Sequence, residues 1–264
     1  MEPLHLTLLQ IPLAWHQAGT NRHYIQKILE DLDQESDVIL LPEMFTTGFT
    51  MEVEHQSEDM EGPSIDWMNR MAQLKKCWIG GSLIIKEEGS YYNRFIMMSP
   101  DGIVGEYDKR HLFRMAKEHD YFMEGEEFVR LRLKGWNIVP MVCYDLRFPV
   151  WSRNRLDGEG RLAADLMLYV ANWPARRQAH WDILLQARAI ENQCYIAGVN
   201  RVGKDQNDIE YSGSSAIIDP KGQVLQHLVH QEGILRQVLD PEMMTTYREK
   251  FPAWKDADVF DLSI

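Results

Sequence analysis

The chain has 264 residues, of which 45% are hydrophobic and 26% charged, so it can bury a sizeable globular core. Its formal net charge of −12 at pH 7 argues against nucleic acid or an anionic membrane as the main partner, since both bind basic surfaces. Its three cysteines, Cys77, Cys143 and Cys194, are too few and too far apart for a disulfide framework.

The N-terminal residues carry no sign of a targeting segment. They lack the basic start and the long apolar run of a signal peptide, and no later run has the length that crosses a bilayer. We therefore expect a cytoplasmic protein that does not enter a membrane.

Short β-like runs alternate with amphipathic helical stretches in the first half of the chain. The apolar patterns predict a strand, a helix and a second buried strand at residues 4–10, 21–32 and 37–41. A helix that begins at Pro63 follows. Turn residues then separate three further predicted strands, at residues 78–86, 91–98 and 103–107.

The second half begins with a polar stretch, residues 109–127, of a length that is often functional in compact domains. A hairpin of strands 128–133 and 136–142 leads to Cys143. The patterns then predict strands 166–170 and 195–199 around a helix at 178–192, a hairpin around residues 219–222, and a short helix from Pro241. With no linker or repeat, we expect one α/β domain over residues 1–264 with mixed strand directions.

Three chemically reactive residues follow predicted strands directly. Glu43 follows DVILLP, Lys109 follows IVGEYD, and Cys143 follows WNIVPMV. Because ligands bind at the carboxyl ends of strands in α/β sheets, the three side chains are predicted to meet in one pocket. A carboxylate can deprotonate a thiol, and an ammonium can stabilise the oxyanion that forms when a thiolate attacks an amide.

The motifs around these residues resemble those of the nitrilase superfamily of C–N hydrolases: LPEMF, YDKRHLF and VCYDLRFP. Further segments are similar to the bacterial omega-amidases, which hydrolyse 2-oxoglutaramate and 2-oxosuccinamate: ANWP, AHW, ARAIENQ, NRVG and REKFPAW. The resemblance implies a four-layer αββα sandwich, a homodimer, and a thioester mechanism without metal or organic cofactor.

The resemblance also implies roles for individual residues. Glu43 would be the base, Lys109 the oxyanion stabiliser and Cys143 the nucleophile, with the backbone N–H of Tyr144 completing the oxyanion hole. Glu118 looks like the family's second glutamate, although three other acids lie nearby in the sequence, Glu124, Glu126 and Glu127.

The substrate-binding residues are predicted from chemistry and position. Phe45, Phe113 and Trp173 lie beside the motifs, where they would form apolar walls. A 2-oxo dicarboxylate monoamide also needs cationic or N–H partners for its carboxylate. The candidates are Arg114, Arg176 and Arg177.

Alternative interpretations remain open at this level. A single cysteine after an apolar strand is usually an inert core residue, and only the joint presence of Glu43 and Lys109 favours a nucleophile at Cys143. The histidines show no metal-ligand spacing. The enzymatic alternatives are a deaminated-glutathione amidase, a carbamoylase or a nitrilase, and the alternative from another class is a noncatalytic small-molecule binding scaffold.

Overall fold

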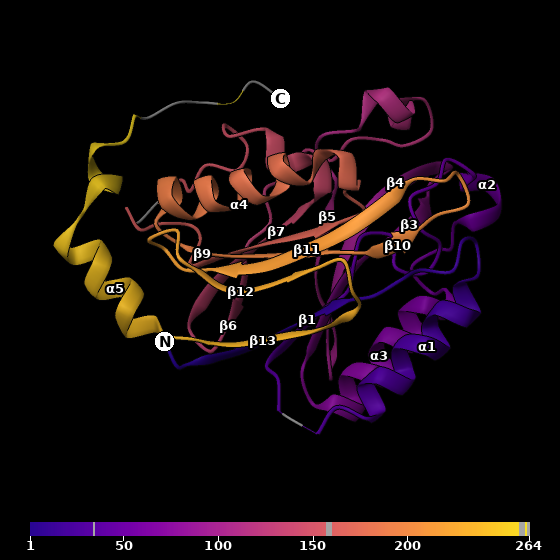
Figure 1. Ribbon diagram of the computed structural model, residues 1–264, viewed down its shortest axis with the longest axis horizontal. Helices are drawn as coiled ribbons and strands as arrows, with labels where there is room; N and C mark the ends of the chain where they lie inside the picture. Colours follow the sequence, from indigo (N-terminus) through magenta and orange to yellow (C-terminus); the bar gives the residue numbers. More distant parts are fainter. Residues whose placement is uncertain (34, 157–159, 259–261, 263–264) are drawn as a thin grey trace.

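The computed structural model describes residues 1–33, 35–156, 160–258 and 262, which form two β-sheets packed face to face between helices (Figure 1). The first sheet has six strands in this order: β13 (Gly233–Leu239), β1 (Leu4–Gln10), β2 (Val38–Leu40), β3 (Trp78–Glu87), β4 (Ser90–Ser99) and β5 (Gly102–Asp108). Strands β1, β2 and β3 run parallel, and the outer pairs are antiparallel.

The second sheet repeats this plan of a parallel centre with antiparallel edges. Its order is β10 (Val202–Lys204), β11 (Glu210–Ile218), β9 (Tyr195–Asn200), β8 (Leu166–Ala171), β7 (Trp136–Val142) and β6 (Leu131–Leu133), while β12 (Val224–Val229) also pairs with β11. Because β7, β8 and β9 are parallel, their carboxyl ends lie at one edge of the sheet.

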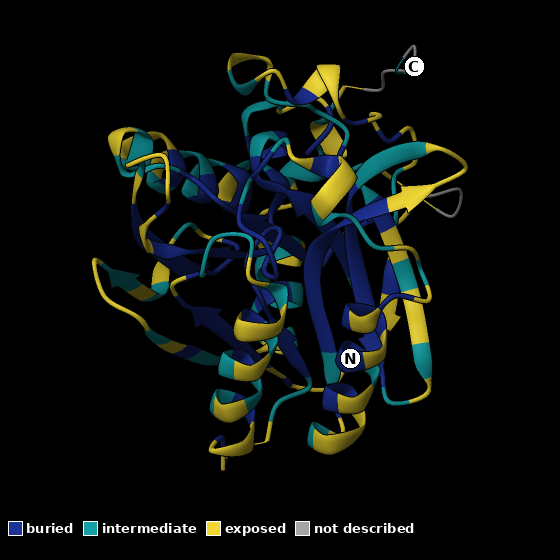
Figure 2. Cartoon of the chain, turned by 90° about the vertical axis from the view of Figure 1, so that its right-hand side faces the viewer, coloured by how far each residue is buried: buried dark blue, intermediate teal, exposed yellow. Residues whose placement is uncertain are grey.

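The layers follow from the alternation of side chains along the strands. In β1, Leu4, Leu6 and Leu8 enter the core between the sheets, whereas Leu9 belongs to a second cluster under the outer helices. That second cluster includes Ile25 of α1 (Ala18–Glu30) and Met68 of α3 (Pro63–Lys75). The central strands of both sheets are almost wholly buried, the edge strands β5, β12 and β13 are partly exposed, and the helices expose their outer faces (Figure 2).

Helix α4 (Gln178–Asn192) covers the second sheet. Trp181, Leu185 and Ala189, spaced by four residues, form its buried face. A Cβ at Gly198 of β9 would lie 2.7 Å from Leu185, so the glycine permits close helix-to-sheet packing. The resulting order of layers is helix, sheet, sheet, helix, which confirms the predicted αββα sandwich (Figure 1).

Most predicted elements are present, with shifted ends. Strand β7 and helix α4 have the predicted bounds, whereas β6 is three residues long because residues 128–130 do not pair. The sequence analysis missed three elements, α2 (Val53–Gln56), β10 and β13. The remaining helices are α5 (Pro241–Lys250) and five short 3-10 helices, η1 (Arg114–Ala116), η2 (Glu118–Asp120), η3 (Cys143–Arg147), η4 (Ala175–Arg177) and η5 (Ala253–Asp256).

No helix in the described part of the chain has the length and apolarity needed to span a membrane.

Candidate active site

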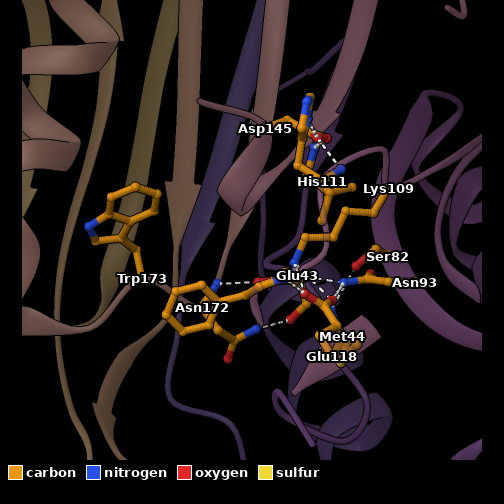
Figure 3. Close-up of polar contacts among 12 residues, drawn as sticks. Glu43, Met44, Ser82, Asn93, Lys109, His111, Glu118, Asp145, Asn172 and Trp173 are labelled. Carbon is orange, nitrogen blue, oxygen red and sulfur yellow. Dashed lines mark hydrogen bonds and ion pairs between the residues drawn. The ribbon is translucent and has the colours of Figure 1, made fainter. Parts of the chain in front are cut away.

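The ends of β2, β5 and β7 bring three side chains together. Glu43 lies beyond β2, Lys109 follows β5, and Cys143 follows β7 at the start of η3. The Nζ atom of Lys109 lies 3.0 Å from Oε1 of Glu43 (Figure 3), and Cys143 is close enough to act on the charges of both. The structure therefore assembles the predicted trio at one site.

A tight turn held from both sheets presents Glu43. Met44 adopts the left-handed conformation, with φ at 42°, and its N–H donates to Oγ of Ser82 over 2.9 Å. From the other sheet, the N–H of Asn172 donates to Oε2 of Glu43 over 2.8 Å, and its side chain donates to the carbonyl of Glu43 (Figure 3). A non-glycine residue at positive φ is costly, so these contacts fix the carboxylate.

Glu118 is the second carboxylate on Lys109. Its two oxygens lie 2.9 and 3.0 Å from Nζ, and Oε2 also accepts the N–H of Phe113. Of the four acids considered in the loop, Glu118 is the fully buried one. The structure thus places the predicted residue beside Lys109. Glu124 is exposed instead, with its Oε1 3.9 Å from Nη1 of Arg110.

Burial and charge set the protonation of this cluster. Burial lowers the pKa of the Lys109 ammonium, but Glu118 and Glu43 outweigh it and raise the pKa above its ordinary value. Burial raises the pKa of the Glu118 carboxyl, Lys109 opposes this, and Glu43 adds to it. Lys109 therefore stays cationic, and the two carboxylates share its single charge.

Asn93 joins the two carboxylates. Its Nδ2 donates to Glu43 over 2.8 Å and to Glu118 over 3.3 Å, while its backbone carbonyl accepts the N–H of Lys109 (Figure 3). Oε1 of Glu43 thus accepts two bonds and Oε2 one, and a carboxylate oxygen has two acceptor sites. One site on Oε2 remains for the thiol proton of Cys143.

Cys143 sits at a strained corner between β7 and η3. Its φ is 45°, a conformation that non-glycine residues seldom adopt outside functional sites. Burial raises the pKa of the Cys143 thiol well above its ordinary value, Glu43 raises it further, and Lys109 lowers it. The resting thiol is therefore protonated, and a base must take its proton before it can attack.

Asp145 ties the cysteine corner to the lysine strand. Its Oδ2 accepts the N–H of Val142 over 3.0 Å and the hydroxyl of Tyr107 over 2.7 Å. Its Oδ1 accepts the backbone N–H of His111 over 2.9 Å and lies 2.8 Å from the His111 ring (Figure 3). Asp145 thus connects the residues before the nucleophile with both sides of Lys109.

Lys109 and Cys143 face a pocket of 840 Å³, within the range of small-molecule sites, and Glu43 lies behind Lys109. Lys109, Cys143 and Tyr144 line it, as do two of the predicted aromatic walls, Phe113 and Trp173. Further walls come from three segments for which no pocket role was predicted, around Trp15–His16, Phe49–Gln56 and Asp205–Tyr211. Their pocket positions depend on long-range packing, and their local patterns carry no signal of it.

Two predicted substrate residues lie elsewhere. Phe45 is fully buried beneath the helices, with its ring centroid 5.8 Å from that of Trp67, because it continues the outward-facing side of β2. Arg114 is exposed on η1 and does not line the pocket, although its neighbours Phe113 and Met115 do. Of the predicted arginines, Arg176 and Arg177 do line the pocket, and Arg147, for which no pocket role was predicted, lines it with them.

Comparison with known proteins places this geometry in a family. Residues 5–249 match the family described as carbon-nitrogen hydrolase. The chain belongs to the carbon-nitrogen hydrolase family. It is 48% identical to omega-amidase YafV of Escherichia coli (strain K12), over 99% of this chain and 100% of that one. It is 34% identical to a 2-oxoglutaramate amidase of Bacillus subtilis (strain 168), over 95% and 96% of the two chains.

A solved structure supports the same placement of this carbon-nitrogen hydrolase. A CN-hydrolase superfamily protein of Xanthomonas campestris, whose crystal structure carries an arsenic adduct in the active site, is 44% identical. The two structures superpose with a TM-score of 0.97 over 100% of both chains. The nitrilase-superfamily resemblance drawn from the sequence motifs is therefore confirmed.

No group of three or more histidine, cysteine, aspartate or glutamate side chains with metal-binding geometry occurs among the described residues. What the site does contain is a buried thiol, a carboxylate with a free acceptor site and a fixed ammonium, which together can attack a carboxamide and hold the resulting oxyanion.

Proposed function

We propose that this carbon-nitrogen hydrolase is an omega-amidase that hydrolyses the terminal amide of 2-oxoglutaramate and 2-oxosuccinamate to the 2-oxo dicarboxylate and ammonia. The observation that carries the proposal is the convergence of Glu43, Lys109 and Cys143 at one site, where Lys109 and Cys143 line the pocket and Glu43 lies in ion-pair contact with Lys109. The near full-length similarity to an omega-amidase and to a 2-oxoglutaramate amidase supports the substrate class.

In this mechanism Glu43 takes the thiol proton and the Cys143 sulfur attacks the amide carbon. The carbonyl oxygen becomes an oxyanion beside Lys109. When the C–N bond breaks, Glu43 returns the proton to the nitrogen, ammonia leaves, and a thioester to Cys143 remains. Glu43 then deprotonates a water that attacks the thioester carbon, which releases the carboxylic acid and restores the thiol.

The second oxyanion donor is the backbone N–H of Tyr144. This N–H lies in the first turn of η3, where the N–H groups have no acceptor within the helix. The left-handed conformation of Cys143 directs the chain sharply from β7 into this turn, so the first N–H groups of η3 lie next to the sulfur. Loss of one oxyanion donor typically costs on the order of 10²–10³ in kcat.

Glu118 serves Lys109 in this scheme. Because Glu118 holds Nζ through both oxygens, Glu43 is free to exchange protons without releasing the ammonium. We also propose that residues 1–264 form one domain, that two copies form a homodimer, and that the enzyme works in the cytoplasm without a metal or organic cofactor, as the motif resemblance implies.

The test compares ammonia release from 2-oxoglutaramate with release from glutamine, N-carbamoyl amino acids, deaminated glutathione and a nitrile. We expect the highest kcat/KM with 2-oxoglutaramate. A preference for one of the others would assign the enzyme to that other branch of the family, and no release from any of them would favour a binding scaffold.

A further inference from the structure

Three arginines line the pocket beside Trp173 and Phe113: Arg147, Arg176 and Arg177. Among the described residues, no carboxylate lies within ion-pair distance of any of them. The other cation in the pocket, Lys109, is fully neutralised by Glu43 and Glu118. The pocket therefore carries uncompensated positive charge away from the reacting trio.

Arg147 is held in place by two neighbours. It lies on η3, four residues after the nucleophile, with its guanidinium carbon 4.9 Å from the centre of the Trp173 ring. Its Nη2 lies 2.8 Å from Nδ1 of His180, on the first turn of α4. Since a guanidinium only donates, Nδ1 of His180 is the acceptor, and the imidazole must leave this nitrogen unprotonated.

Arg177 faces the same space from η4. Its guanidinium carbon lies 5.1 Å from the centre of the Phe113 ring, and its backbone carbonyl accepts the indole N–H of Trp173 over 2.8 Å. Burial lowers the pKa of the Arg177 guanidinium, Arg176 and Arg147 lower it further, and Cys143 opposes them. The side chain is therefore close to two like charges and to the nucleophile, and an anion between the arginines would relieve their repulsion.

The acidic residues of the pocket do not pair with these arginines. Asp205 accepts the hydroxyl of Tyr211 over 3.0 Å and two backbone N–H groups of its own loop. Glu52 also lines the pocket, directly before α2, and its side chain is exposed to solvent. A planar, bidentate ligand such as a carboxylate suits the paired guanidinium groups.

We propose that Arg147 and Arg177 bind the carboxylate of the substrate at the end remote from the reacting amide, and that His180 is a positioning residue that fixes Arg147. This inference rests on the proposed omega-amidase function. It accounts for selectivity toward amides that carry a distal carboxylate, because a neutral amide leaves the two guanidinium groups without a partner in a partly dry pocket.

The experiment measures kcat and KM with 2-oxoglutaramate and with pentanamide, a neutral amide of similar length. We expect Arg177→Gln to raise KM for 2-oxoglutaramate about 10- to 100-fold and to leave the constants for pentanamide within about twofold, since a charge-assisted bond is lost only with the anionic substrate. Arg114→Gln removes the same charge from an exposed residue that does not line the pocket. It should leave kcat and KM unchanged for both substrates.

Two substitutions of His180 test the positioning role. His180→Ala should raise KM for 2-oxoglutaramate with little change in kcat. In His180→Asn the side-chain oxygen can replace Nδ1 as the acceptor, so KM for 2-oxoglutaramate should return most of the way to the wild-type value. A purely structural role for His180 would affect both amides equally and would not be rescued.

The outcomes separate the two proposals. If the wild-type enzyme prefers pentanamide, the omega-amidase function is wrong. If the wild-type enzyme prefers 2-oxoglutaramate and Arg177→Gln keeps that preference, the arginine site alone is wrong. The same holds if Arg177→Gln loses activity toward both amides to the same extent.

Discussion

Asn93 is the buried residue on which both site carboxylates depend. It lies in the middle of β4, is fully inaccessible, and donates from one amide nitrogen to Glu43 and Glu118. Because both bonds come from one fixed amide nitrogen, Asn93 holds the two carboxylates in position around Nζ of Lys109.

Asn93→Ala removes this donor from both carboxylates. The kcat for ammonia release should fall about tenfold while KM stays within about twofold, because a base that is out of position takes the thiol proton less efficiently. Steady-state kinetics of ammonia release measures both constants.

Asn154→Ala serves as the matched control. Asn154 is also buried and bonded, to Ala164 and Asn192, but it lies outside the pocket. Asn154→Ala should lose stability without a change in kcat. An unchanged kcat in Asn93→Ala would show that Asn93 does not position the carboxylates.

At the scale of elements, the junction of β7 and η3 fixes the nucleophile. Asp145 accepts four contacts there, from Val142, from Tyr107 and two from His111. An asparagine has two acceptor sites on its oxygen and turns an N–H₂ group toward the other donors. Asp145→Asn should therefore lower the free energy of unfolding by about 3 kcal/mol and lower kcat more than it raises KM.

Tyr107→Phe provides the graded comparison for Asp145→Asn. It removes one of the four donors, so the free energy of unfolding should fall by about 1–2 kcal/mol while kcat stays within about threefold of the wild type. Urea unfolding and steady-state kinetics report the two quantities. Full activity in Asp145→Asn would mean that the backbone at Cys143 keeps its conformation without the Asp145 carboxylate.

Elements with strong local signals could be predicted from the sequence. The apolar run of β7, bounded by a turn and the nucleophile, and the four-residue spacing in α4 gave the observed bounds. Strand β13 has no such signal, because five of its seven residues are at least partly exposed and its partner β1 is more than 220 residues away. Strand β10 and helix α2 are too short for a periodic pattern.

The same distinction holds for the site. Glu43, Lys109 and Cys143 stand at strand ends, which is a local property, and their motifs marked them. The partners that orient them are set by register across the sheets. Asn93 looks like an ordinary strand residue, and Phe45 differs from a pocket residue only by the side of the chain on which it lies.

At the scale of the whole molecule, buried thiols couple stability to alkaline pH. Burial raises the pKa of Cys194 to about 12, from 9.0 for the free group. A raised folded-state pKa means that the native protein keeps a proton that the unfolded chain loses, so stability is full below pH 9 and falls as pH rises toward 12.

Cys194→Ala should remove this contribution. Between pH 8.5 and 10 the wild-type free energy of unfolding should fall by about 1 kcal/mol more than that of the variant, since each pH unit above the unfolded pKa costs about 1.4 kcal/mol per thiol. Other titrating groups cancel in the comparison. Parallel stability curves for the two proteins would show that Cys194 does not keep its proton in the fold.

The most direct test of the account is the mass of the enzyme during turnover. Wild-type protein mixed with 2-oxoglutaramate and quenched in acid should carry the substrate acyl group, less ammonia, on the peptide that contains Cys143. Cys143→Ala should carry none and release no ammonia, while Cys77→Ala and Cys194→Ala should still form the adduct. Ammonia release by Cys143→Ala, or an acyl group on another residue, would contradict a thioester mechanism at Cys143.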